Sequence, residues 1–529
     1  METPNDKPSI WSNSWFPVLL LVLVFIGVFA WIYDPKLNLG GDNVNYYTLG
    51  IALSSGHGYV NIQYPARPEA SHFPPGYPAI IALVILLTGG GFPAVKILNG
   101  FFLLTSCLML YQIVYLLFKR KVLAFMSALT VMLSMHLLQY STIMMSEMPY
   151  VFFTTLMLWL MTNIALNPEV IWWKSMEFWI SLVLIGIGFY IRSIGLTAIS
   201  GMALFWIVRK QWLAALATFV GFFLMILPWS LRNNRLGGAG GYLHQFLQKN
   251  PYNPGLGTLN VFDLIHRILF NFRRYVTHDI PDAIFSRPSS IAPEHVTVTM
   301  WLGGLILLAL IIWGIFQFKQ LKWFVFGFMG STFLILLLWP EQWYGVRFMI
   351  PVLPFVFISL VLGVDSVIGW SIRHWSSRTP MMTYKMVPLL MLLLLPFEWN
   401  GISTLNANAN SYFPKAYANY FRLALWTQKN LPKSAIVACR KPDFLYIFSR
   451  HYTYSSPLSG SPIKVVSLLE KAHVTHIIVG QLGYASTYKT IIPTIKAYPK
   501  LFKPVYRFIN PDTRLYQFLP DSTQLKDGQ

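Results

Sequence analysis

The sequence predicts a mainly α-helical, polytopic membrane protein with a small α/β domain near its C-terminal end. Three observations support this. Hydrophobic residues make up 55% of the 529 residues and charged residues only 11%. Long apolar segments recur over the first three quarters of the chain, and alternating strand and helix patterns follow only after residue 405. The lipid core has no water to satisfy backbone groups, so such segments must cross it as helices.

About eleven apolar segments are candidates for membrane spans. They cover residues 15–33, 93–118, 122–140, 146–166, 178–191, 193–208, 212–231, 299–318, 323–340, 347–370 and 386–398. The two segments between residues 178 and 208 are short and fit either two spans or one broken unit. Residues 79–88 are too few to cross, so we expect a juxtamembrane or re-entrant helix there.

The positions of the basic residues predict the orientation. Lys119, Arg120 and Lys121 follow the second span directly, and short loops rich in Lys and Arg stay in the cytoplasm. The loop over residues 34–78 is therefore expected on the extracytoplasmic side. Counting the spans onward places the long loop over residues 232–298 on that side as well.

One boundary divides the predicted chain. Residues 1–405 would form the transmembrane domain, and residues 406–529 an extracytoplasmic α/β domain. In the latter, residues 416–430 have an amphipathic helical pattern, SAIVACRK and THIIVG resemble strands, and KVVSLLEKAHV between them resembles a helix.

Composition and motifs also exclude several classes of function. The net charge of +20 fits cytoplasmic loops and anionic lipid head groups, and no nucleic-acid-binding module accompanies it. Cys107 and Cys439 are not expected to meet. The chain lacks HExxH, CxxC and dinucleotide-binding motifs. We therefore expect no cofactor, although a bound divalent cation stays open.

The first loop contains the most conspicuous acid, Asp42, in the motif GGDNVNYY. One interpretation is a helix N-cap, in which the carboxylate accepts from free backbone N–H groups. The other is a general base, with Gly41 allowing the chain to approach a substrate closely. The two are compatible. Tyr46 in the same motif and Tyr77 in the later motif HFPPGYP complete the candidate substrate loop.

Further polar residues stand at predicted membrane boundaries. Glu147 in SEMPY is either a functional acid or ordinary first-turn helix chemistry. Arg192 and Arg347 either hold phosphate oxygens or extend toward lipid head groups. Tyr344 is either a phosphate-site residue or an interfacial aromatic. His72 precedes a rigid Pro-Pro corner, and it either contacts ligand or belongs only to the turn that starts the juxtamembrane helix.

Taken together, GGDNVNYYTLGIALSSGHGY, HFPPGYP, SEMPY, RSIGL and GVRFMIPVLP occur in an order that resembles a known family. It is that of bacterial GT-C glycosyltransferases of the dolichyl-phosphate-mannose–protein mannosyltransferase type, whose relatives include the aminoarabinose transferases that modify lipid A. The resemblance covers roughly the first three quarters of the chain. It is much weaker for the C-terminal domain.

The resemblance implies inverting transfer of a sugar, a hexose or pentose, from an undecaprenyl- or dolichyl-phosphate donor to an extracytoplasmic glycolipid, cell-envelope glycan or protein. By matching position, Asp42 would deprotonate the acceptor and Glu147 would orient acceptor or donor. Arg192 and Arg347 would hold the departing phosphate. The implied location is the bacterial inner or plasma membrane, with active-site loops and C-terminal domain in the periplasm.

Two departures from the family patterns concern the substrate. Asn43 stands where protein mannosyltransferases usually carry a second acid, and His72 where aminoarabinose transferases tend to carry a lysine. Two other functions fit the same residues: a transporter or flippase of lipid-linked saccharides, and a non-catalytic GT-C-like protein that binds lipid carriers. Transporters usually contain internal repeats, and we find none, which favours an enzyme.

Overall fold

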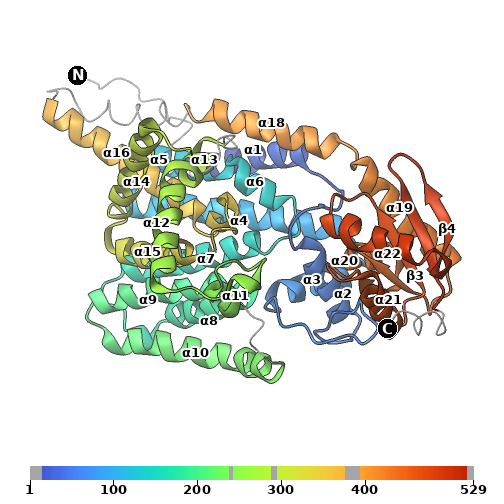
Figure 1. The fold of residues 1–529 in the computed structure, drawn as a ribbon. Coiled ribbons are helices and arrows are strands. Elements are labelled where there is room, and N and C mark those ends of the chain that lie inside the picture. Colours follow the sequence, from blue (N-terminus) through green and yellow to red (C-terminus); the bar gives the residue numbers. More distant parts are fainter. Residues whose placement is uncertain (1–14, 238–241, 287–294, 376–392, 521–529) are drawn as a thin grey trace, which may run out of the picture. The chain divides into compact units, whose positions relative to one another are not determined.

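The computed structural model of the chain describes residues 15–237, 242–286, 295–375 and 393–520 (Figure 1). These residues form two compact units. A helical unit contains residues 15–38, 71–77 and the described part of 90–410, and a mixed unit contains residues 39–70, 78–89 and 411–520. The sequence suggests a single boundary near residue 405, whereas the observed units interleave: most of the first loop clusters with the C-terminal part.

The helical unit consists almost entirely of α-helices. They are α1 (Phe16–Ile32), α4 (Phe92–Phe118), α5 (Lys121–Met132), α6 (Met135–Ser141), α7 (Glu147–Leu166), α8 (Met176–Ile191), α9 (Thr197–Val208), α10 (Trp212–Arg235), α11 (Tyr242–Leu247), α12 (Val261–Arg274), α13 (Ile280–Phe285), α14 (Val298–Ile315), α15 (Lys322–Leu338), α16 (Leu353–Trp375) and α18 (Leu395–Asn410). Helix α3 (Gly76–Thr88) crosses the division between the units.

Six of the described helices are long and apolar enough to cross a membrane: α4, α7, α10, α14, α16 and the helix containing α15. The segment over residues 122–140, expected as one span, is broken into α5 and α6, which meet at an angle of 60°. Helices α1, α3 and α8, and residues 193–208, are shorter apolar helices. The total of eleven spans thus stays a prediction, and most of the segment 386–398 lies outside the described residues.

Glycines allow neighbouring apolar helices to approach closely. A Cβ on Gly314 of α14 would lie 1.7 Å from the carbonyl oxygen of Ser359, and one on Gly363 of α16 would lie 2.2 Å from that of Leu310. Both distances are far below van der Waals contact, so this helix pair requires residues without side chains. Small residues at helix crossings serve the same purpose in membrane proteins generally.

Basic residues of the predicted cytoplasmic loops bind helix ends. Arg209 donates to the carbonyl oxygens of Ile164 and Ala165 at the end of α7, at 3.4 and 3.2 Å, and Lys319 donates to the carbonyl of Leu117 in the last turn of α4. Cations at these positions satisfy carbonyls that a helix leaves unpaired and offset its dipole. In both of these predicted cytoplasmic loops, a basic side chain therefore donates to carbonyl oxygens at the end of a helix.

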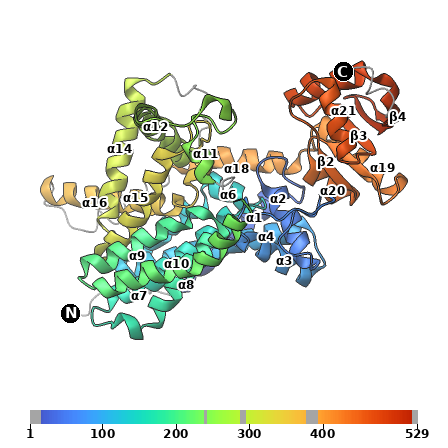
Figure 2. The same cartoon turned by 60° about the horizontal axis from the view of Figure 1, so that its bottom comes forward.

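The mixed unit contains a five-stranded sheet (Figure 2). Its strands are β1 (Ile436–Cys439), β2 (Tyr452–Ser455), β3 (His476–Gly480), β4 (Phe502–Phe508) and β5 (Thr513–Phe518), in the order β2-β1-β3-β5-β4. β1 is parallel to β2 and β3, and β5 is antiparallel to β3 and β4. The two strands and the helices that we expect from sequence are present. β2, β4 and β5 are additional.

Helices cover both faces of this sheet. They are α19 (Lys415–Asn430), α20 (Pro442–Ser449), α21 (Pro462–Lys471) and α22 (Ile492–Ala497), and α2 (Asn43–Ser54) packs against α20. Ala438 of β1 packs with Val465 of α21 in the main core. Its neighbour Cys439 points to the other face, where it interacts with the Tyr420 hydroxyl of α19, as the alternation of side chains along a strand requires. The fold class predicted from the sequence is confirmed.

Candidate active site

A buried carboxylate with two guanidinium groups is the most distinctive polar cluster of the helical unit. Oε1 of Glu147 lies 2.8 Å from Nη1 of Arg192 and 3.3 Å from Nε of Arg347. The Glu147 side chain is fully buried, whereas 15% of the Arg192 side chain and 30% of the Arg347 side chain are exposed. The three residues are far apart in sequence, so only the packing of the helices brings them together.

Local backbone geometry places each member of this cluster. Glu147 is the first residue of α7, after Ser146 at the N-cap position. The Ser146 hydroxyl makes no capping hydrogen bond but accepts from Nη1 of Arg192 at 3.1 Å. Arg192 occupies the extended break between α8 and the next helical turn. Arg347 lies in a 3-10 turn (Val346–Met349) preceded by Gly345, whose φ of +102° favours glycine.

The charges of this cluster suit an anionic ligand. Two positive guanidinium groups face one negative carboxylate, and Oε2 of Glu147 is buried with no hydrogen-bond partner among the described residues. Removing charges from water is costly unless they are paired, so the carboxylate fixes both arginines in place. Extension toward lipid head groups, the alternative for Arg192 and Arg347, would not bring both to the same oxygen. Guanidinium groups fixed in this way are suited to phosphate oxygens.

The HFPPGYP corner packs beside this cluster. Tyr77 is completely buried, and its hydroxyl accepts from Nδ2 of Asn99 on α4 at 3.0 Å. A Cβ on Gly76 would lie 2.6 Å from the carbonyl oxygen of Tyr190, two residues before Arg192. Both residues therefore fix the corner against the helices. His72 is exposed, with its ring edge-on to Phe73 at 4.5 Å.

Tyr344 belongs to a second polar cluster, which the sequence does not reveal. Its ring lies 4.8 Å from the guanidinium carbon of Arg274. Arg274 is buried, donates to Oδ2 of Asp279 at 3.3 Å and to the carbonyl oxygen of Glu341 at 3.1 Å. Residues 275–279 form a turn of π-helix, a distortion frequent at functional sites. A turn of π-helix has no recognisable sequence pattern. The basic residues of this segment do not indicate a polar cluster by themselves either.

The residues of the GGDNVNYY motif lie in the mixed unit. Asp42 occupies the N-cap position of α2, yet its side chain makes no capping hydrogen bond, so this aspartate does not serve as a conventional cap. Gly41 has a φ of +70°, which turns the chain tightly before the helix. Asn43 is buried and its Nδ2 donates to the carbonyl oxygen of Gly40, and Tyr46 is buried as well.

A carboxylate that we did not single out from sequence attaches the first loop to the C-terminal part. Oδ1 of Asp443, in the first turn of α20, accepts from Nε2 of Gln63 at 2.8 Å and lies 3.5 Å from the hydroxyl of Thr48 on α2. The carbonyl of Gln63 in turn accepts from the backbone N–H of Thr453 on β2 at 2.8 Å. Burial raises the pKa of Asp443 to about 6, against the lowering effects of hydrogen bonds and of Lys441.

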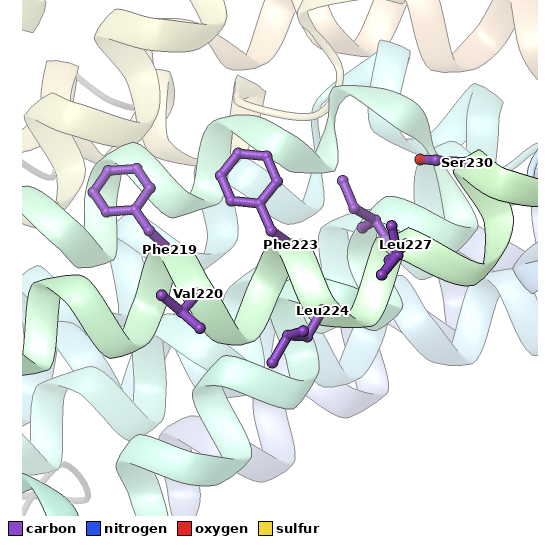
Figure 3. A pocket seen from close by; sticks show the side chains of 7 residues that line it. Phe219, Val220, Phe223, Leu224, Leu227 and Ser230 are labelled. Atoms are coloured by element: carbon purple, nitrogen blue, oxygen red, sulfur yellow. The ribbon is translucent and has the colours of Figure 1, made fainter.

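An open apolar hollow of about 470 Å³ beside α10 has a different character (Figure 3). Phe219, Phe223 and Leu227 line it together with other residues of the same helix, and none of its lining residues is charged. Only 28% of the apolar stretch of this helix is buried in the structure. We assign the hollow to the surface that faces lipid, not to a site for chemistry. Among the described residues, no three His, Cys, Asp or Glu side chains gather as metal ligands would.

The fold is similar to those of solved GT-C membrane glycosyltransferases, and a comparison of sequence agrees with this over part of the chain. A sequence model of the dolichyl-phosphate-mannose-protein mannosyltransferase family matches residues 72–231, which include His72, Glu147 and Arg192. No curated protein matches the chain in sequence. The resemblance predicted from the motifs is thus confirmed at the level of the fold, and in sequence for residues 72–231.

Two solved proteins represent the structural relatives. The oligosaccharyltransferase AglB of Archaeoglobus fulgidus, tethered to an acceptor peptide, matches with a TM-score of 0.60 at 11% identity, over 97% of this chain and 75% of its own. ArnT of Cupriavidus metallidurans, solved with undecaprenyl phosphate, matches with a TM-score of 0.58 at 11% identity, over 96% and 99%. A further AglB structure contains dolichol-phosphate and an inhibitory peptide, with a TM-score of 0.56 at 13% identity, over 95% and 74%.

Proposed function

We propose that this protein is an inverting glycosyltransferase that moves a sugar from a polyprenyl-phosphate donor to an acceptor outside the cytoplasm, in a bacterial inner or plasma membrane. The observation that carries the proposal is the pair of arginines fixed on one buried carboxylate, Glu147. The polyprenyl phosphates in the structures of ArnT and AglB support it. The acceptor is a glycolipid, an envelope glycan or a protein.

In the proposed reaction, Asp42 takes the proton of an acceptor hydroxyl as the acceptor oxygen forms a bond to the anomeric carbon of the donor sugar. The bond from that carbon to the phosphate oxygen breaks, and the polyprenyl phosphate leaves with the electron pair. Attack opposite the leaving group inverts the anomeric centre. No covalent intermediate is needed, so one base is sufficient.

The developing charge on the phosphate is the second requirement. Arg192 and Arg347 are assigned to hold the leaving phosphate, because charge-assisted and bidentate hydrogen bonds from guanidinium groups are strong. Glu147 is assigned to position them. His72, Tyr344 and Tyr46 are assigned to the neighbourhood of the substrate, whereas the buried hydroxyl of Tyr77 is assigned to positioning the corner.

The test uses full-length protein in lipid nanodiscs with radiolabelled polyprenyl-phosphate sugars. Transfer to added acceptors and release of free polyprenyl phosphate are both measured. Asp42→Asn should reduce transfer by about 10²–10⁴-fold, as loss of a general base does, with donor binding unchanged. Asp34→Asn, in the same loop, is the matched control. Transfer by Asp42→Asn at the rate of the natural protein would refute the base assignment.

The same assay distinguishes a flippase. A flippase would move the intact lipid-linked sugar across the membrane without breaking its bond to phosphate. Movement of labelled donor without any release of lipid phosphate, for every donor tried, would therefore replace the proposed transferase with a transporter.

A further inference from the structure

The sheet of the mixed unit contains a topological switch point. From β1 the chain passes through α20 to β2 on one side of β1, and then through α21 to β3 on the other side. All three strands are parallel. In open sheets of this kind, ligands bind outside the carboxyl ends of the strands, where successive connections leave in opposite directions. Here that place is the end of β1 beside β3.

The residues at this place are basic and aromatic. Arg440 and Lys441 follow β1 directly, and Tyr484 follows β3 after a turn at Gly483. The guanidinium carbon of Arg440 lies 4.5 Å from the centre of the Tyr484 ring, and Nζ of Lys441 lies 5.2 Å from it. Two cations from one strand end therefore converge on an aromatic side chain from the next strand.

These cations have no ion-pair partner among the described residues, although the charge of Lys441 acts on the carboxylate of Asp443. Within the part of the chain that the structure describes, neither Arg440 nor Lys441 forms an ion pair, and Nε of Arg440 is buried with no hydrogen-bond partner. The nearby carboxylate of Asp443 accepts instead from Gln63. A ligand oxyanion would supply the ion-pair partner that both side chains lack among the described residues.

The pKa of the Tyr484 phenol reflects the positive potential of Arg440 and Lys441. Burial by itself would raise its pKa, but hydrogen bonds with Lys441 and Tyr417 and the charges of Lys441 and Arg440 lower the pKa overall. The hydroxyls of Tyr417 and Tyr484 thus lie together beside the cations. Such hydroxyls are suitable partners for the hydroxyl groups of a sugar ring.

We infer that the carboxyl edge between β1 and β3 is a binding site for an anionic saccharide. Arg440 and Lys441 hold its phosphate or carboxylate group, and Tyr417 and Tyr484 contact its sugar. The anionic part follows from the charges alone, whereas the choice of a saccharide rests on the proposed function, for which this site would select the acceptor.

The test measures binding of small probes to full-length protein in nanodiscs, without any donor. The probes are mannose 6-phosphate and trigalacturonate, with maltotriose as the neutral comparison and inorganic phosphate as the free anion. Both anionic saccharides should bind, and maltotriose should bind far more weakly. The double variant Arg440→Gln/Lys441→Gln should weaken their binding about tenfold or more, and Tyr484→Phe should weaken it less.

The matched control is Lys433→Gln, an exposed lysine just before β1, which should bind as the natural protein does. Equal binding of maltotriose, unchanged binding in the double variant, or no binding of either anionic saccharide would overturn the inference. Inorganic phosphate binding as tightly as mannose 6-phosphate would refute the saccharide part. Thermal unfolding of each variant confirms that it is folded.

The result of this binding test can be distinguished from the result of the transfer test for the proposed function. If Asp42→Asn abolishes transfer but the double variant binds the probes normally, only this inference fails. If no donor supports transfer while the double variant loses binding, only the proposed function fails.

Discussion

Nη1 of Arg192 lies 2.8 Å from Oε1 of Glu147, although Glu147 is the first residue of α7 and Arg192 directly follows α8. The same oxygen is 3.3 Å from Nε of Arg347. One carboxylate therefore determines where two cations stand, and its loss should affect both stability and ligand binding.

Replacing Glu147 with Gln keeps the shape of the side chain but removes the charge that the two arginines share. Removing one partner of a buried ion pair costs about 3–5 kcal/mol of stability. The midpoint of thermal unfolding in detergent should therefore fall. Donor-dependent transfer should fall as well. Glu169→Gln, an exposed glutamate in the loop after α7, should change neither quantity. An unaltered midpoint for Glu147→Gln would show that the pair contributes nothing to the fold.

Arg347→Ala should raise the donor concentration needed for half-maximal transfer. Hydrogen bonds to charged groups contribute about 1.5–3 kcal/mol, which corresponds to about 10–150-fold. Arg347→Lys should restore only part of this, since a lysine lacks the planar fork. Lys174→Ala, at an exposed basic position, is the control. Equal effects of Arg347→Ala and Lys174→Ala would return Arg347 to a role at the lipid surface.

Asn43→Asp tests the departure from protein mannosyltransferases. The Asn43 amide donates to the carbonyl oxygen of Gly40 from a fully buried position. An ionised carboxylate is an acceptor only, so the variant should lose this hydrogen bond and loosen the turn before Asp42. We expect slower transfer and faster proteolysis in the first loop. Asn45→Asp, two residues later, is the control. Faster transfer by Asn43→Asp would mean that the second acid of the family is tolerated here.

Asp443 should make the attachment of the first loop depend on pH. Its pKa is raised to about 6, above an unfolded value of about 3.9. Between these values the folded state binds more protons than the unfolded state, so stability falls as pH rises from about 4 to 6.

The pH dependence can be measured by hydrogen exchange of the amides in α2 and α20, corrected for intrinsic rates. Asp443→Asn should flatten it and add roughly 3 kcal/mol of local stability above pH 6, because the penalty for burying a charge disappears. If local stability depended on pH equally in the natural protein and in Asp443→Asn, the pH dependence would belong to another titrating group.

Gly314→Ala tests the close approach of α14 and α16. A Cβ there would meet the carbonyl oxygen of Ser359 at 1.7 Å, so the helices must separate and the thermal midpoint should fall clearly. Gly303→Ala lies on the same helix with nothing within 4 Å of the added carbon. It should be neutral or slightly stabilising, since alanine is the better helix former. Similar effects of the two substitutions would refute the proposed close packing.

The sequence by itself determined the helical membrane class, the α/β character of the C-terminal part and the approximate bounds of most of the long apolar helices. These properties are local: the length of an apolar segment and the period of its pattern suffice to predict them. The bend of 60° between α5 and α6 was not predicted, because the apolar pattern continues through it.

Only the tertiary structure decided which polar residues meet. Glu147, Arg192 and Arg347 were each candidate site residues in the sequence, and each also had an ordinary structural explanation. The contact of both arginines with one carboxylate oxygen of Glu147 depends on the packing of three separate segments. Asp443 and the pair Arg440 and Lys441 carried no sequence signal, because ordinary surface residues look the same. Their significance comes from burial and from the order of the strands, which are non-local properties that no single stretch of sequence contains.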